Sequence, residues 1–174
     1  MKASFKPSCT VALCLALGLL APAAVRAEDP KPTDRVLVTF EHPEKFLDVR
    51  DSNFPTVEGR DKILESLRAY VTKRAPAFLP AGDCLYVTFT NIKLAGVFSV
   101  GEVSSGGRFM FPGTPPLFMF GWAITDPSGK VVRRAWEKLE KDSYMDLFRN
   151  ADPGDPLRYD KAVLDDWMRN TLQT

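Results

Sequence analysis

The sequence has little of the residue types on which most metal sites and nucleophilic enzymes depend. Its 174 residues include one histidine and three cysteines. His42 is therefore the only histidine available to a serine or cysteine nucleophile, and it lies far in sequence from Cys84. A zinc site would need carboxylates for nearly all of its other ligands, which is unusual. These shortages remove most of the common enzyme classes, though not every enzyme.

Sequence motifs for phosphate, nucleotide and calcium binding are also missing. There is no P-loop, no G-x-G-x-x-G after a strand, no H-E-x-x-H and no EF-hand loop. An excess of one charge is lacking too, because 23 basic residues face 22 acidic ones and the formal net charge is +1. A near-neutral surface of mixed sign argues against a nucleic-acid partner. No cofactor and no catalytic residue are predicted.

The most apolar run of the sequence, Val11–Leu20, is too short to span a bilayer. Lys2 and Lys6 precede it, and the small-residue pattern of Val25–Ala27 follows. This arrangement predicts a cleaved signal peptide over residues 1–27 and a mature chain without a transmembrane segment. We therefore expect export to the periplasm, with an extracellular location as the alternative.

Only one cysteine remains once the predicted signal peptide is removed. Cys84 then has no partner for an internal disulfide, although an exported protein could form one. It begins an apolar strand pattern, so we interpret it as a small buried residue rather than a reactive thiol.

The remaining chain suits one domain. Residues 28–34 form a polar, proline-containing lead-in that we expect to be flexible, and residues 35–174 form a single domain. Residue patterns predict strands over 35–40, 84–92, 117–125 and 131–139, a helix over 56–73, and a last helix opened by Asp155 and Pro156. Asp126–Gly129 predicts the turn of a hairpin. The order β-α-β-β-β-α favours an α+β fold, with a mainly antiparallel sheet of about four strands and both helices packed on one face.

Carboxylates are frequent between the first strand and the first helix. Asp48, Asp51 and Glu58 form the clearest polar cluster in the sequence. Paired carboxylates could perform acid–base chemistry or bind Ca²⁺. We favour a structural interpretation, in which the two aspartates form turns, Glu58 lies at a helix N-terminus, and Arg50 and Arg60 neutralise the charges.

Residues 97–116 combine a glycine-, serine- and proline-rich composition with large apolar side chains. Phe98, Phe109, Met110 and Phe111 all lie in this segment. A loop of this length is uncommon in a compact domain and is often functional. Exposed aromatics there could bind a partner or an apolar ligand. Alternatively, residues 109–111 fold back onto the sheet as an extra strand or as part of the core.

The three tryptophans lie on two predicted strands and the last helix. Trp122 and Trp136 could form a cross-strand aromatic pair in the hairpin, and Trp167 falls on an apolar helix stripe. Core packing is the favoured role for all three, and a carbohydrate-binding platform is the alternative.

Four short segments together resemble a known family. They are Pro43–Asp48 (PEKFLD), Asn91–Gly96 (NIKLAG), Asp155–Lys161 (DPLRYDK) and Asp165–Trp167 (DDW). The chain resembles the family catalogued as domain of unknown function 3016 (DUF3016), predicted periplasmic proteins of Gram-negative bacteria. The resemblance implies a periplasmic location and a compact α+β domain, but no activity or cofactor. This chain departs from the family where Val97 and Phe98, rather than an acidic residue, follow Leu-Ala-Gly.

The sequence thus favours a non-catalytic binding or envelope-accessory protein that uses the loop of residues 97–116. Its partner would be an envelope protein or a small apolar ligand. One alternative is a carboxylate-based, metal-dependent hydrolase near Asp48. The other is a structural or chaperone-like factor in envelope assembly, because an exposed strand edge could recruit an extended segment.

Overall fold

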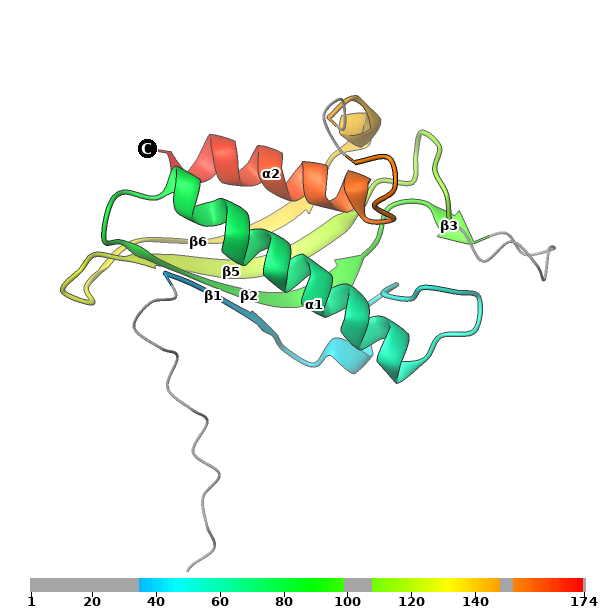
Figure 1. Ribbon diagram of the computed structural model, residues 1–174, viewed down its shortest axis with the longest axis horizontal. Helices are drawn as coiled ribbons and strands as arrows, with labels where there is room; N and C mark the ends of the chain where they lie inside the picture. Colours follow the sequence, from blue (N-terminus) through cyan, green and yellow to red (C-terminus); the bar gives the residue numbers. More distant parts are fainter. Residues whose placement is uncertain (1–34, 99–107, 148–151, 174) are drawn as a thin grey trace, which may run out of the picture.

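The computed structural model places two α-helices on one face of a four-stranded sheet (Figure 1). It describes residues 35–98, 108–147 and 152–173. The predicted signal peptide (1–27) and lead-in (28–34) lie outside the described residues. In the described ranges, no helix combines the length and the apolar composition that crossing a bilayer requires.

The main sheet is mixed and has the strand order β1-β2-β5-β6. Its strands are β1 (Val36–Phe40), β2 (Cys84–Lys93), β5 (Leu117–Thr125) and β6 (Val131–Glu140), and the helices are α1 (Val57–Arg74) and α2 (Arg158–Leu172). Strand β1 pairs parallel to β2, while the other two pairings are antiparallel. Helix α1 connects the parallel pair, as such pairs require a long crossover. The expected α+β class is confirmed, with one parallel pairing in the sheet.

Shorter elements complete the described chain. They are β3 (Val97–Phe98) and β4 (Arg108–Phe109), which pair in a separate two-stranded ribbon, and three 3₁₀ turns at Pro43–Lys45, Ala75–Phe78 and Asp142–Asp146. Phe109 lies in β4, which pairs with β3 and not with the main sheet. The predicted loop therefore does not add a strand to the main sheet at Phe109.

Helix α1 forms where its sequence pattern predicts. Thr56 is the N-cap, and its hydroxyl accepts a hydrogen bond from the Gly59 backbone N–H at 2.9 Å. The predicted apolar stripe faces the sheet and is buried at Ile63, Leu64, Leu67 and Val71. Hydrophobic burial of this stripe therefore holds α1 against the sheet.

The last helix begins later than the sequence predicts. Asp155 is not its N-cap, because α2 starts at Arg158 and Leu157 occupies the N-cap position. Instead, Asp155 Oδ1 accepts a hydrogen bond from the Leu157 backbone N–H at 2.8 Å and closes a turn before the helix. The apolar stripe is buried as expected, and the Trp167 ring lies 4.8 Å from that of Phe120.

The predicted hairpin is present, but the prediction that Trp122 and Trp136 form a cross-strand pair is wrong. Trp122 lies opposite Ala135, and Trp136 lies opposite Gly121. The two indoles therefore point to opposite faces of the sheet. Trp122 is 6 % exposed beneath the helices, whereas Trp136 is 62 % exposed on the other face. Core packing is confirmed for Trp122 and Trp167 and is wrong for Trp136.

The sequence predicts that Cys84, at the start of β2, is buried. The structure shows it half-buried instead. Alternation along β2 sends Leu85 and Val87 into the core, so Cys84 points to the face without helices.

Candidate ligand cavity

Asp48 is fixed beside the end of β2 by backbone pairing. Its N–H donates to the Ile92 carbonyl at 3.2 Å, and its carbonyl accepts from the Leu94 N–H at 3.0 Å. These bonds form a short parallel bridge beyond β1. The Asp48 side chain is consequently held next to the Leu-Ala-Gly step of residues 94–96.

Arg108, at the start of β4, crosses this step and joins it to Asp48. Its side chain is 9 % exposed and pairs with Asp48 Oδ2 at 2.6 Å. The same guanidinium donates to the carbonyls of Ala95 at 2.8 Å, Leu94 at 3.2 Å and Gly96 at 3.3 Å. One arginine thus satisfies a carboxylate and three consecutive carbonyls at the end of β2.

Phe98 lies between two arginines that share one carboxylate. The guanidinium carbons of Arg50 and Arg108 lie 5.1 Å and 4.8 Å from the centre of its ring. Arg50 Nε also donates to Asp48 Oδ1 at 2.9 Å. The predicted neutralisation of Asp48 by Arg50 is confirmed. Arg60 pairs with Asp61 instead of the predicted cluster.

Asp160, in the first turn of α2, is the most deeply buried carboxyl group described. It is 1 % exposed, and its Oδ1 accepts a hydrogen bond from the Ala95 backbone N–H at 2.9 Å. Burial raises the pKa of Asp160 to about 7, although the Ala95 N–H and the charge of Arg108 act in the opposite direction. Asp160 therefore holds α2 to the Leu-Ala-Gly step through the Ala95 N–H, whereas Arg108 binds the carbonyls of the same step.

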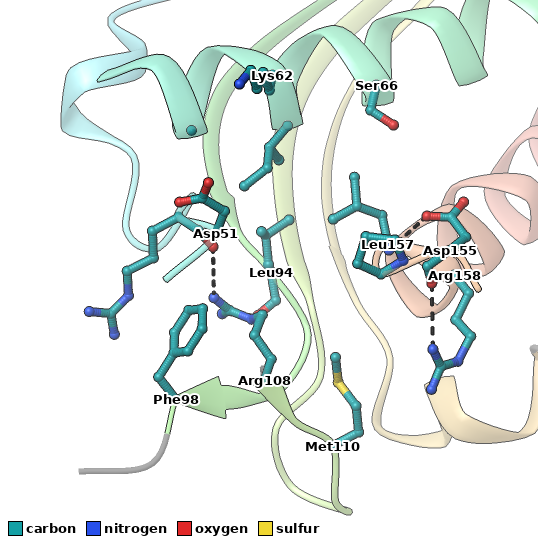
Figure 2. Close-up of a pocket in the computed structure, with 14 residues that line it drawn as sticks. Asp51, Lys62, Ser66, Leu94, Phe98, Arg108, Met110, Asp155, Leu157 and Arg158 are labelled. Atoms are coloured by element: carbon teal, nitrogen blue, oxygen red, sulfur yellow. Dashed lines mark hydrogen bonds between the residues drawn. The ribbon is translucent and has the colours of Figure 1, made fainter. Parts of the chain in front are cut away.

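A cavity of about 530 Å³ opens between α1, the β3–β4 ribbon and the segment before α2. Figure 2 shows Lys62 and Ser66 on α1, Phe98, Arg108 and Met110 on the ribbon side, and Leu157 beside α2. Its apolar wall is formed by Ile63, Leu94, Phe98, Met110 and Leu157. Arg108 and its partners fix the ribbon wall of this cavity.

The structure separates the four apolar residues predicted for binding. Phe98 and Met110 line the cavity, and Phe98 is buried. Phe109 and Phe111 do not line it and are 49 % and 47 % exposed. Residues 99–107 of the predicted loop lie outside the described residues, so the structure describes the two ends of this segment.

The predicted polar cluster is also divided. Asp51 lines the cavity, and Asp48 pairs with Arg108 and Arg50. Glu58 does not line the cavity and forms an exposed ion pair at 2.7 Å with Lys62, which does. Among the residues that the structure describes, no three His, Cys, Asp or Glu side chains group as possible metal ligands. Asp48 lies in a parallel bridge and not in the predicted turn, and its carboxylate pairs with two arginines.

Sequence reasoning missed Arg108 and Asp160. Arg108 lies in a glycine-rich segment where an isolated arginine carries no periodic signal. Asp160 lies inside the Asp155–Lys161 segment of the family resemblance, next to the apolar stripe of α2. A charged residue next to such an apolar stripe could have been used to predict a buried polar contact.

Replacing Gly96 with alanine should displace the β3–β4 ribbon. Gly96 has φ +74°, and an added Cβ would lie 2.5 Å from the Phe109 carbonyl oxygen. We expect the free energy of unfolding to fall by about 1–3 kcal/mol, which urea denaturation would measure. Gly113→Ala is the matched control, because Gly113 has φ +87° but no atom within 4 Å of the added Cβ. Equal losses in both variants would show that the close approach at Gly96 is unimportant.

Comparison with known proteins gives a family and nothing more specific. The family model described as "Protein of unknown function (DUF3016)" matches residues 34–170. None of the curated proteins or solved structures compared with the chain matches it. The match contains all the described strands and helices except the last residues of α2.

Proposed function

Because the chain belongs to the DUF3016 family, whose function is unknown, we propose a function from the cavity geometry of this member: it is an exported, non-catalytic protein that binds a small, largely apolar ligand. The single observation that carries this proposal is the apolar-walled cavity of about 530 Å³. Ligand sites commonly have volumes of roughly 300–1,000 Å³ and are lined mainly by apolar side chains with a few polar groups. We place the protein in the periplasm, on the strength of the signal-peptide pattern of residues 1–27.

The polar side chains beside the cavity support binding rather than catalysis. Arg108 uses its donors on Asp48 and on backbone carbonyls. Asp155 accepts from the Leu157 N–H at 2.8 Å and from Lys161 Nζ at 2.6 Å. These groups hold segments of the chain together, and an acid–base catalyst would need a proton that it can exchange with a substrate.

The alternative functions receive less support. A metal-dependent hydrolase near Asp48 would have to displace two arginines from that carboxylate. A chaperone-like role would use a strand edge, but at the β1 edge Arg68 Nε donates to the Val38 carbonyl at 3.2 Å. That bond occupies a group that an added strand would need. A contact between an envelope protein and exposed Phe109 and Phe111 stays a prediction.

Filling the cavity should abolish binding of a neutral apolar probe. We expect N-phenyl-1-naphthylamine to bind the wild-type protein saturably at one site, with fluorescence as the readout. Ser66 lines the cavity from α1 and is half-buried, so Ser66→Phe should occupy the ligand volume and weaken binding at least about tenfold.

Ser66→Ala is the matched control, because it changes the same position without filling the space. Its affinity should equal that of the wild type. Circular dichroism and thermal unfolding would verify that both variants are folded. Absence of saturable binding by the wild type, or equal binding by folded Ser66→Phe, would refute the cavity as the site.

A further inference from the structure

We propose that the ligand is an anionic amphiphile, a single alkyl chain that ends in a carboxylate or phosphate, with its anionic end among the basic residues of the cavity. This inference rests on the proposed function, because it assigns the charge of the ligand at the same site. It also rests on a comparison between the hydrogen-bond donors and acceptors of the cavity that have no partner in the described residues.

The acceptors of the cavity are largely occupied. Both oxygens of Asp155 are used, one by the Leu157 N–H and the other by Lys161 Nζ. Lys161 is 15 % exposed on its side chain, so this pair is well shielded from water. Asp51 is the one lining carboxylate for which the described residues show no hydrogen bond or ion pair.

The cavity retains more donors than acceptors. Arg158 Nη1 donates to the backbone carbonyls of Pro153 at 3.2 Å and Asp155 at 3.5 Å, and within the described chain it has no carboxylate partner. Among the described residues, Arg50 bonds to Asp48 through Nε, and its two terminal nitrogens have no hydrogen-bond partner there. The guanidinium geometry of these two arginines suits carboxylate and phosphate oxygens.

Lys62 adds a third cation from the opposite wall. Its ion pair with Glu58 is exposed on both sides, at 73 % and 78 % of the two side chains. Such exposed pairs contribute little energy, so a ligand anion can replace Glu58 at small cost. In Figure 2, Lys62 extends from α1 and Arg158 from the start of α2, which border the cavity on different sides.

Charge and shape therefore indicate the same ligand class. Asp48 is one negative group shared by Arg50 and Arg108, which leaves a positive surplus at the Phe98 side. Asp51 offsets part of this surplus and buried Asp160 offsets part of the charge of Arg108, whereas Arg158 has no carboxylate partner among the described residues. The apolar wall accommodates the alkyl chain, while the surplus of donors requires acceptors on the ligand.

The test compares three probes of equal chain length by displacement of N-phenyl-1-naphthylamine from the wild-type protein. Decanoate is the anion, 1-decanol the neutral analogue and decyltrimethylammonium the cation, all used below the concentrations at which they form micelles. We expect decanoate to bind at least about tenfold more tightly than 1-decanol, because charge-assisted hydrogen bonds are stronger than neutral ones. The cation should bind least, and added salt should reduce the preference. A parallel arm with decyl phosphate distinguishes a phosphate from a carboxylate end.

The doubly substituted variant Lys62→Gln/Arg158→Gln should lose the preference for decanoate and retain its affinity for 1-decanol. Lys73→Gln is the control, because Lys73 is exposed on α1 but does not line this cavity. If decanoate and 1-decanol bind the wild type equally, the anionic assignment is overturned and the proposed function stands. If the dye binds but no alkyl probe displaces it, the assignment of an anionic amphiphile is overturned and the proposed function stands. If the dye itself does not bind saturably, both fail.

Discussion

Replacing Arg108 with leucine should lower the free energy of unfolding by about 2–4 kcal/mol. Arg108 is 9 % exposed and pairs with Asp48 at 2.6 Å. Its removal leaves the Asp48 carboxylate, 19 % exposed on its side chain, with only Arg50 as a partner, and it deprives the carbonyls of residues 94–96 of their donor. Breaking one side of a buried pair costs more than the pair contributes, because the remaining charge has lost its compensation. Urea denaturation with tryptophan fluorescence would measure the loss.

Arg50→Leu is the matched control for this prediction. Arg50 bonds to the other oxygen of the same carboxylate at 2.9 Å, but its side chain is 36 % exposed. We expect a cost below about 1 kcal/mol, as for other exposed ion pairs. A loss in Arg108→Leu no larger than that in Arg50→Leu would contradict the central structural role given to Arg108.

Replacing Asp160 with asparagine should remove a component of the pH dependence of stability. The pKa of Asp160 in the folded protein is raised to about 7 by burial, while an unfolded aspartate titrates near 4. Between these values the folded state holds a proton that the unfolded state has released. The contribution of Asp160 is therefore fully present below about pH 4 and is lost as the pH rises through about 7.

The measurement is the difference in free energy of unfolding between Asp160→Asn and wild type from pH 4 to pH 8. From pH 4 to pH 8 the wild type should lose on the order of 2–4 kcal/mol of free energy of unfolding relative to Asp160→Asn. The asparagine oxygen can still accept the Ala95 N–H, so the contact itself is preserved. A constant difference across this range would show that Asp160 titrates normally.

Asp165→Asn provides a control of opposite sign. Burial raises the pKa of Asp165, but hydrogen bonds from Arg169 and Arg74 lower it further, so the net pKa lies below its ordinary value. Its contribution is present above the unfolded pKa and is lost as the pH falls. The Asp165→Asn variant should therefore be less stable than wild type near neutral pH and approach it in acid.

Residue periodicity was sufficient to predict most of the fold. The alternation of Leu85, Val87 and Phe89, the stripe of α1 and the Asp126–Gly129 turn all depend on local rules, and the structure contains each of them. The tryptophan pair failed for a reason that periodicity cannot reveal. A shift in register between Ile124 and Thr125 changes which face of β6 meets the core. An irregularity of one residue is enough to move Trp136 to the other face.

The cavity was predictable only in part. Phe98 and Met110 attracted attention because apolar residues are unusual in a glycine-rich loop. The role of Arg108 depends on Asp48 and on the carbonyls of residues 94–96, which are distant in sequence and meet only after β1 and β2 pair. Asp160 and Ala95 are likewise brought together by packing of α2. Contacts of this kind follow from tertiary structure, and no local pattern encodes them.

Native mass spectrometry of the protein recovered gently from the periplasm tests the central claim most directly. The wild type and Ser66→Phe would be expressed with the full N-terminal sequence and compared with Ser66→Ala. We predict a bound mass in the wild type and in Ser66→Ala that dissociates on denaturation, and the bare polypeptide in Ser66→Phe. Bare polypeptide in all three proteins, or the same bound mass in all three, would contradict the proposal that this cavity binds a ligand.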